Sequence, residues 1–342
     1  MQPDPWSLYA LMLKSRLFEN VIAKLWHDGL VSGEMHLGTG EEAIIAGVVT
    51  QLREGDALAL DHRGTAALLM RGVDPLAILH ELLGHQDGLC GGMGGHMHLF
   101  SQQHLAASSG IVGAAGPAAA GFALSAQQLH PGTIAVAFFG ESAMNQGMLL
   151  ESLNLAAVWN LPVLFVCKDD SWGITTQSAK ALGGDLTERA RGFGVSAVAV
   201  DGRNVSDVWQ AAQVAIEHAR SGQGPSFIQA SCVHLEGHFL GFQLLRMVRK
   251  PFKEMPGIAL PLTRSFLQPR GAPWRERVAG LKEVLTAVLA TLRDPRRNSA
   301  NDPIRRTRET LLREPDRLRE LEDQIEHEIG HLLASTLAEV PS

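Results

Sequence analysis

Two predicted strands that each run into acidic residues constrain the fold of this chain more than any other feature. Residues 133–139 are followed by Gly140 and Glu141, and residues 163–167 are followed three positions later by Asp170. Apolar strands of this kind are typical of a parallel sheet with helices on both faces. Because parallel strands bring their carboxyl ends to one edge of the sheet, Glu141 and Asp170 could converge there on one hard cation such as Mg²⁺.

The rest of the chain alternates predicted helices and strands. We expect helices at residues 6–30, from 41 onward, and at 114–128, 143–159 and 205–220, with further strands at 195–200 and 226–230. This alternation predicts an α/β fold, a doubly wound parallel sheet with flanking helices. Residues 84–116 are dense in Gly, Met and His, so we expect no regular element there and a backbone that lies near a ligand.

The character of the sequence changes near residue 245. We predict an α/β domain over residues 1–245, an atypical Arg- and Pro-rich insertion over 246–301, and a C-terminal helical segment over 302–342. Within the last segment Leu318, Leu321, Ile325 and Leu332 lie at near-heptad spacing. That apolar stripe predicts a helix that packs either on its own domain or on a partner subunit.

Composition argues against several classes of protein. The formal net charge of −6 speaks against a nucleic-acid-binding surface. The three cysteines lie far apart and form no CxxC pattern, which predicts no disulfide framework and fits a reducing compartment. Neither a signal-peptide pattern nor an apolar run of about 18 residues is visible, so we expect a cytoplasmic protein without a membrane partner.

Several motifs occur together in a characteristic order. They are Gly33-Glu34-Met35-His36-Leu37-Gly38-Thr39-Gly40-Glu41-Glu42-Ala43, His62-Arg63-Gly64, Gly94-Gly95-His96-Met97-His98, Gly110-Ile111-Val112-Gly113-Ala114, Asn145-Gln146-Gly147, Leu155-Ala156-Ala157-Val158-Trp159 and Gly237-His238. In this combination the sequence resembles the α subunit of the thiamin-diphosphate-dependent E1 component of 2-oxo acid dehydrogenases, the acetoin and pyruvate dehydrogenase branches above all. The likeness runs from about residue 8 to 238 and resumes at 302.

The resemblance implies thiamin diphosphate held through Mg²⁺. The family's metal ligands are an Asp, an Asn side chain and an aromatic residue's carbonyl, which correspond here to Glu141, Asp170 and the carbonyl of Trp172. Both acids depart from that pattern, and Ser142 replaces a Gly. Three alternatives remain for this site. It is a working site with an altered metal preference, which could then bind Mn²⁺ or Ca²⁺, or it is a decayed site, or it is a rearranged site.

Other positions correspond to the family's cofactor contacts. After Gly140, we expect Ser142 and Ala143 to present free amides to phosphate at a helix N-terminus. Arg63 matches an arginine that contacts the diphosphate, and a planar guanidinium suits that partner. His234 stands where relatives carry a second such arginine.

The remaining positions implied by the resemblance surround the reactive part of the cofactor. Gly110 and Val112 match backbone contacts to the aminopyrimidine ring, and His62 occupies a hydrogen-bonding position. His36 and His238 match histidines of the active site, so we expect catalytic roles for both. His96 and His98 show no third zinc ligand in the sequence, and we expect no zinc there.

The resemblance also implies partners. The glutamate that activates the cofactor comes from a β subunit in this family, so we expect an α2β2 heterotetramer that is incomplete without β. The expected activity is cleavage of a 2-oxo acid or acetoin-like keto substrate, with transfer of the acyl or two-carbon unit to a lipoyl-bearing E2 or another carrier. The alternatives are a specialised ketol or acyl transferase that serves a carrier protein, and a non-catalytic structural subunit.

Overall fold

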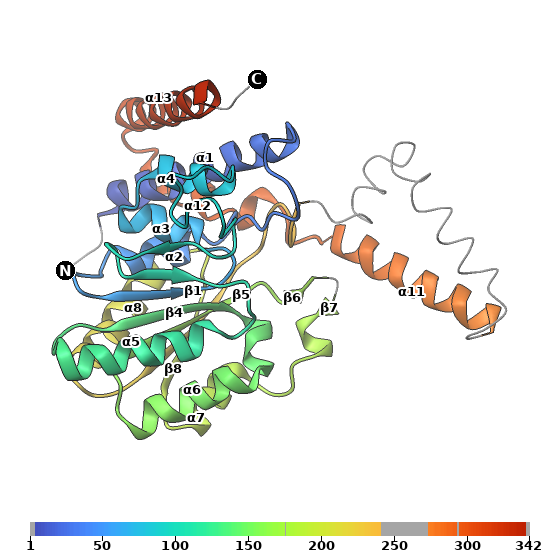
Figure 1. Ribbon diagram of the computed structural model, residues 1–342. Helices are drawn as coiled ribbons and strands as arrows, with labels where there is room; N and C mark the ends of the chain where they lie inside the picture. Colours follow the sequence, from blue (N-terminus) through green and yellow to red (C-terminus); the bar gives the residue numbers. More distant parts are fainter. Residues whose placement is uncertain (1–3, 175, 241–272, 293, 340–342) are drawn as a thin grey trace.

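The computed structural model describes residues 4–174, 176–240, 273–292 and 294–339 (Figure 1). Its main sheet has seven strands in the order β2-β3-β1-β4-β5-β9-β8. The pairs are parallel except β2 with β3. The strands are β1 (Ala57–Leu60), β2 (Phe100–Ser101), β3 (Ala106–Ser108), β4 (Ala135–Gly140), β5 (Val163–Asp169), β8 (Ser196–Val200) and β9 (Ser226–Ser231). A separate antiparallel pair joins β6 (Trp172–Gly173) to β7 (Thr176–Gln177).

Helices cover both faces of the sheet, as a doubly wound fold requires. One face carries α5 (Ala115–Leu129), α6 (Gly147–Val158) and α7 (Leu186–Gly192). The other carries α2 (Glu42–Val49), α3 (Thr65–Arg71) and α8 (Val205–Arg220), with α1 (Pro5–His27) and α4 (Pro75–Leu82) outside them. The chain continues with α11 (Trp274–Leu292), α12 (Pro303–Leu311) and α13 (Pro315–Glu339), and short 3₁₀ turns occupy Glu141–Asn145, Ser178–Lys180 and Ser299–Asn301.

Side chains alternate between two cores along each central strand, because successive residues of a strand point to opposite faces. On β4, Val136 and Phe138 join the core beneath α2 and α8, whereas Ala135, Ala137 and Phe139 join the core beneath α5 and α6. The alanines let the Ala-rich helix α5 approach the sheet closely. Both faces of β4 are therefore buried, as its uniformly apolar sequence predicts.

Two sequence-based expectations are wrong in detail. Residues 84–116 do contain regular structure, because β2 and β3 lie within them and β3 pairs with β1 in the main sheet. The helix expected at 143–159 is broken: Glu141–Asn145 forms a 3₁₀ turn, Gln146 is extended, and α6 begins only at Gly147. Ser142 and Ala143 therefore lie in a 3₁₀ turn and not at an α-helix N-terminus.

The C-terminal segment packs on its own domain. In α13, Leu318, Ile325 and Ile329 are buried, and they join cores that also contain side chains of α1. The aliphatic stripe predicted from the sequence is thus covered within this chain. Of the predicted insertion, residues 246–272 lie outside the described residues, and α11 projects from the body in Figure 1. No described helix has the length and apolar character needed to cross a membrane.

Close backbone contacts bring two distant loops to the carboxyl edge of the sheet. Gly40 has a φ of 104°, and a Cβ at that position would lie 2.0 Å from the carbonyl oxygen of Val233. Only glycine fits such an approach. Met35 and Leu240 exchange backbone hydrogen bonds of 3.1 and 2.7 Å. These contacts hold the loop before α2 against the loop after β9, and both loops carry predicted site residues.

Candidate active site

A cavity of about 430 Å³ opens at the carboxyl edge of the parallel strands. Its walls come from the segments that follow β1, β3, β4, β5 and β9, together with the start of α2. The predicted site residues that line it are His62, Arg63, Val112, Gly140, Glu141, Ser142, Ala143, Trp172, His234 and His238. The fold therefore brings most of the predicted set to one place, where open α/β sheets bind ligands.

A network of buried charges forms the floor of this cavity. The ammonium group of Lys168 donates to Glu41 Oε2 at 2.7 Å and to Asp61 Oδ1 at 3.0 Å. Glu41 and Lys168 are almost entirely buried, and the Lys168 pKa is raised because the two acids outweigh the effect of burial. Burial alone would raise the pKa of Glu41. The opposing effect of the Lys168 charge is part of a larger downward shift, so the net pKa is lowered. Paired and hydrogen-bonded in this way, the charges remain ionised inside the protein.

His234 joins this floor to one of the two predicted metal ligands. Its Nε2 lies 2.7 Å from Glu41 Oε1 and its Nδ1 lies 3.0 Å from Asp170 Oδ2. Its backbone N–H also donates to Asp170 Oδ1 at 3.0 Å. Burial and Arg63 lower the His234 pKa, but the two carboxylates outweigh them and the pKa is raised. The Asp170 pKa is lowered, since the His234 charge and hydrogen bonds exceed the effect of burial. Both oxygens of Asp170 thus lie against His234.

Arg63 is buried beside Glu41, at 3.8 Å between Arg63 Nε and Glu41 Oε1. Its terminal nitrogens donate to the backbone carbonyls of Leu37 at 2.5 Å and His238 at 2.6 Å. The guanidinium therefore ties together the loops before α2 and after β9. The same side chain also lines the cavity.

Glu141 forms the opposite, acidic side of the cavity. It is 2% exposed, and Ser178 Oγ donates to its Oε1 at 2.5 Å. Burial, assisted by the charges of Asp169 and Asp170, raises the Glu141 pKa to about 7. Within the described residues the hydrogen-bond partner of this carboxylate is thus a neutral hydroxyl. Glu141 and Asp170 thus follow neighbouring strands as predicted, yet they differ sharply in their partners.

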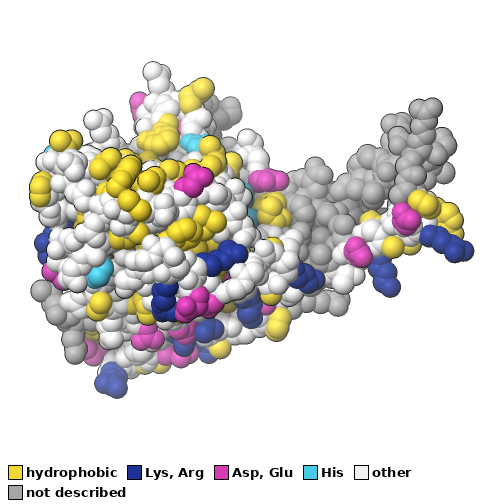
Figure 2. All heavy atoms as spheres, turned by 90° about the horizontal axis from the view of Figure 1, so that it is seen from below, with side chains coloured by type: hydrophobic (Ala, Val, Ile, Leu, Met, Phe, Trp, Pro, Cys, Tyr) yellow, Lys and Arg dark blue, Asp and Glu magenta, His cyan; other side chains and the backbone are white. Residues whose placement is uncertain are grey.

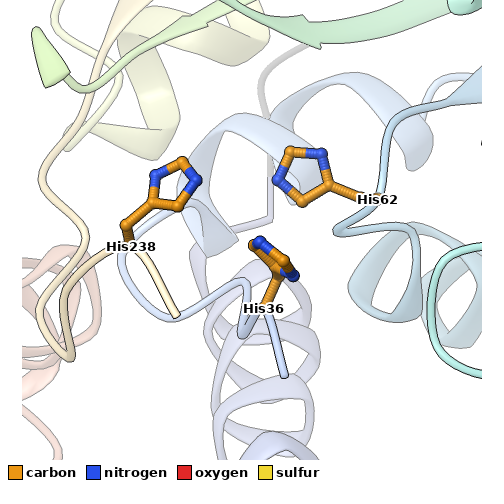
Figure 3. Close-up of side chains that lie close together, drawn as sticks. All are labelled: His36, His62 and His238. Carbon is orange, nitrogen blue, oxygen red and sulfur yellow. The ribbon is translucent and has the colours of Figure 1, made fainter. Parts of the chain in front are cut away.

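Three imidazoles face one another at the other end of the cavity. His36, His62 and His238 come from three separate segments, and Figure 3 shows their rings turned toward a common point. The ring centroids of His36 lie 4.5 Å from His62 and 5.4 Å from His238. A fourth ring joins through His96 Nε2, which lies 2.9 Å from His36 Nδ1. His36 itself is not among the residues that line the cavity.

All four rings are neutral at physiological pH. Burial lowers the pKa of His62 and His96 to about 4 and that of His238 to about 2, and it lowers the His36 pKa as well. The positive charge of Arg63 acts in the same direction on each of them. Neutral imidazole has one nitrogen that accepts a proton and one that donates a hydrogen bond.

Gly110 and Val112 lie in the loop after β3. Val112 is exposed and lines the cavity, whereas Gly110 lies behind it. A Cβ on Gly110 would lie 2.9 Å from Met97 Sδ, so a side chain there would require the Met97 side chain to shift. The loop thus lines the cavity with the apolar residues Ile111 and Val112.

These features fit a diphosphate cofactor held with a cation. The buried ring nitrogens Nε2 of His62 and Nδ1 of His238 have no hydrogen-bond partner, so they are available to a ligand. A Cβ on Gly140 would meet only the Lys168 carbonyl, at 4.0 Å, which leaves room at the end of β4. Glu141 supplies a hard oxygen donor that suits Mg²⁺, Mn²⁺ or Ca²⁺. The engagement of Asp170 by His234 is the feature that fits least well.

Sequence reasoning did not assign roles to Glu41, Asp61 or Lys168. Lys168 offers a signal, because it is a charged residue that directly continues the apolar predicted strand at 163–167. A lysine at such a buried position needs carboxylate partners. Glu41 and Asp61 lie 127 and 107 residues away along the chain, so their pairing with Lys168 emerges only from the fold.

The sequence is similar to proteins of known families. The family described as dehydrogenase E1 component matches residues 9–241. The α subunit of acetoin:2,6-dichlorophenolindophenol oxidoreductase from Bacillus subtilis is 40% identical over 236 residues, which cover 68% of this chain and 71% of that protein. The corresponding subunit from Cupriavidus necator is 39% identical, covering 69% and 71%. The pyruvate dehydrogenase E1 component subunit alpha of Zymomonas mobilis is 36% identical, covering 67% and 66%.

Proposed function

Because this chain belongs to the dehydrogenase E1 component family, we propose that it is the α subunit of a thiamin-diphosphate-dependent enzyme that cleaves a 2-oxo acid or an acetoin-like substrate. The observation that carries the proposal is the cavity itself. It joins a charged floor, an acidic side and a wall of neutral imidazoles at the carboxyl edge of a parallel sheet. The relatives are named for acetoin and pyruvate, which are the first substrates to test.

We assign the metal to Glu141, Asp170 and the carbonyl of Trp172, with Mg²⁺ first and Mn²⁺ or Ca²⁺ as alternatives. The raised pKa of Glu141 supports this assignment, since a buried carboxylate close to other acids favours a nearby cation. Glu141 would then bind the metal as the carboxylate, with its proton displaced. Asp170 would have to turn one oxygen away from His234.

The diphosphate would lie against the amides of Ser142 and Ala143 and the end of β4 at Gly140. Arg63 and His234 would supply positive charge, and the raised pKa of His234 supports that role. Gly110 and Val112 would hold the aminopyrimidine ring through their backbone. When bound, thiamin diphosphate would supply the nucleophilic carbon that attacks a keto group.

The imidazole wall, which consists of His36, His62 and His238, would transfer protons to and from the substrate in the cavity. His238 and His62 each have a buried ring nitrogen without a hydrogen-bond partner, and both rings are neutral. A neutral ring can hold the substrate's carbonyl by donating a hydrogen bond, or accept its proton. His36, whose Nδ1 contacts His96, would orient the wall and act with His238 in catalysis.

The partner we propose is a β subunit in an α2β2 assembly. Exposed apolar side chains on α6 form a stripe at Met148, Leu155, Val158 and Trp159. Next to it, α5 exposes Leu124 and Leu129. Figure 2, viewed from the side of α6 and α7, shows hydrophobic side chains gathered in a broad band. Such patches mark protein interfaces. A lipoyl-bearing E2 or another carrier would receive the product, and residues 1–245 would form the cofactor-binding unit.

One observation favours a second candidate, a non-catalytic subunit that stabilises its β partner. Both oxygens of Asp170 already face His234, through its backbone N–H and its ring. If this pairing holds against a metal, the cofactor is not bound.

Co-purified α and β subunits provide the test. Reduction of 2,6-dichlorophenolindophenol should follow addition of acetoin, pyruvate or a branched 2-oxo acid when thiamin diphosphate and Mg²⁺ are present, and His238→Gln should abolish it. Turnover of ketose phosphates without dye reduction would indicate a ketol transferase instead. Stable assembly with no cofactor binding and no turnover would establish the non-catalytic subunit.

A further inference from the structure

A second group of metal-ligating side chains lies on α13. His327-Glu328-Ile329-Gly330-His331 is an H-E-x-x-H sequence within this 25-residue helix. Histidines four residues apart lie on the same face of a helix, and in this pattern they bind one Zn²⁺ between them. No residue of α13 lines the cavity described above, and Figure 1 shows α13 outside α1, on the far side from the sheet. The proposed function therefore does not use these histidines.

The two rings are already arranged as a pair. His327 Nε2 and His331 Nε2 are 3.0 Å apart, and the ring centroids are 4.3 Å apart. Two nitrogens that bind one Zn²⁺ at about 2.0–2.1 Å in tetrahedral geometry are separated by roughly 3.4 Å. A shift of a few tenths of an ångström would open the pair enough for a metal ion. Both side chains are exposed, so an ion can reach them directly from solvent.

The rest of the helix holds the pair in place. Ile325 and Ile329 are buried on the opposite side of α13, against the core shared with α1. Thr336, one turn beyond His331, is also buried. Packing therefore positions the backbone that carries both histidines before a metal binds.

Glu328 separates this site from a metalloprotease centre. In that class of enzyme the glutamate of the motif acts as a general base beside the metal. Here Lys14 of α1 donates to Glu328 and holds it in an ion pair. Within the described part of the chain, no group of three or more His, Cys, Asp or Glu ligands includes His327 or His331. The arrangement therefore supports metal binding without hydrolytic chemistry.

We propose that His327 and His331 bind one borderline divalent metal ion, of which Zn²⁺ is the first candidate. Imidazole nitrogen is a preferred ligand of Zn²⁺, Ni²⁺ and Cu²⁺, whereas Mg²⁺ and Ca²⁺ prefer oxygen. The two histidines occupy two coordination positions and leave the others to water. Bound there, the ion links two successive turns of α13 and stabilises the C-terminal half of that helix.

Zn²⁺ titration of the metal-free α chain in its complex with β tests this proposal. The measured quantity is the difference between variants, because the imidazole wall and the His80, His85 and Asp87 group also offer ligands. We expect His327→Ala and His331→Ala each to bind one Zn²⁺ fewer per chain than the natural sequence. Glu328→Ala should bind as many as the natural sequence, and so should His130→Ala, which removes an exposed histidine outside these groups.

Hydrogen exchange gives a second readout at the helix itself. Zn²⁺ should slow exchange of the α13 amides around residues 327–335 in the natural sequence and leave them unchanged in His331→Ala. Equal Zn²⁺ stoichiometry in the natural sequence and both histidine variants would overturn the proposal, as would unchanged exchange. Thiamin diphosphate binding is independent of these residues, so failure here leaves the proposed function intact.

Discussion

Histidines occur in two opposite states on the two sides of this cavity. On the floor, His234 lies between the carboxylates of Glu41 and Asp170, and its pKa is raised. On the wall, burial and the nearby Arg63 lower the pKa of His62 to about 4 and that of His238 to about 2. All three side chains are largely shielded from water. The neighbouring charges, and not burial alone, therefore decide whether an imidazole carries its proton.

The same comparison holds for the two predicted metal ligands. Asp170 has a cationic partner and a lowered pKa, whereas Glu141 has a hydroxyl partner and a pKa raised to about 7. The floor is a closed set of paired charges, and the side that carries Glu141 is open to a further cation. A bound metal ion would give Glu141 the cationic partner that the floor carboxylates already have.

The largest effect should follow from removing the central cation of the floor. Lys168→Met leaves Glu41 and Asp61 buried without their shared partner, and breaking a buried pair in this way costs about 3–5 kcal/mol. Urea unfolding of the metal-free chain measures this loss. Lys180→Met, at an exposed lysine, is the matched control and should stay within about 0.5 kcal/mol. A loss below 1 kcal/mol for Lys168→Met would show that the floor charges are not coupled.

Glu141→Gln should stabilise the metal-free chain at pH 8, by up to about 3 kcal/mol. With a folded pKa of about 7, above the ordinary value of 4.5, the folded state holds a proton that the unfolded state releases. Glu141 therefore lowers stability as pH rises from 4.5 to 7, and glutamine removes that slope while it can still accept the Ser178 hydrogen bond. Urea unfolding at pH 5 and pH 8 measures the difference. An unchanged slope would mean that Glu141 is ionised without a cation.

Asp170→Asn should lower the pKa of His234 and destabilise the chain by about 1–3 kcal/mol, since a charged hydrogen-bond partner is lost. Histidine NMR titration resolves this change. The contribution of His234 is present below pH 6.5, its ordinary pKa, and is lost as pH rises through its folded value. The resonances of His62 should not move. Equal pKa shifts at His234 and His62 would contradict the distinction between the floor and the wall of the cavity.

The smallest effect on stability should come from the wall. His238→Gln removes a neutral ring with an unpartnered nitrogen, and we expect a change within about 1 kcal/mol at pH 8. Below pH 6.5 the unfolded state gains a proton that folded His238 does not, so the variant should lose less stability than the natural sequence on acidification toward pH 5. Acid unfolding curves of the two chains test this. A larger acid sensitivity in the variant would contradict the neutral wall.

The parts of the fold that were predictable are those with strong local patterns. The strands β4, β5 and β9 and the helix α8 carry long apolar or amphipathic runs, and the structure confirms each of them. The strand β1 has only four small and medium residues, Ala57–Leu60, which give no distinct pattern. The break before Gly147 was equally hidden, because Glu141–Asn145 has a composition that suits a helix.

The site was predictable as a set of positions but not as a set of charge states. The resemblance indicates the positions of site residues such as Arg63, Glu141, Asp170 and His238. The fold brings most of the indicated residues to one cavity. The opposite pKa shifts of His234 and His238 depend on the carboxylates that face His234, and Glu41 reaches it where Gly40 packs against Val233. Contacts of this range cannot be read from local sequence.

Thiamin diphosphate titration of the co-purified αβ complex, by calorimetry with and without divalent metal, tests the central claim most directly. We predict saturable binding with Mg²⁺, Mn²⁺ or Ca²⁺ that is abolished by a chelator. We further predict that Glu141→Ala removes the metal-dependent affinity while the complex remains assembled, whereas Glu151→Ala, an exposed control on α6, binds normally. Absence of saturable binding with every metal would contradict the account, and unchanged affinity in Glu141→Ala would contradict the assigned ligand.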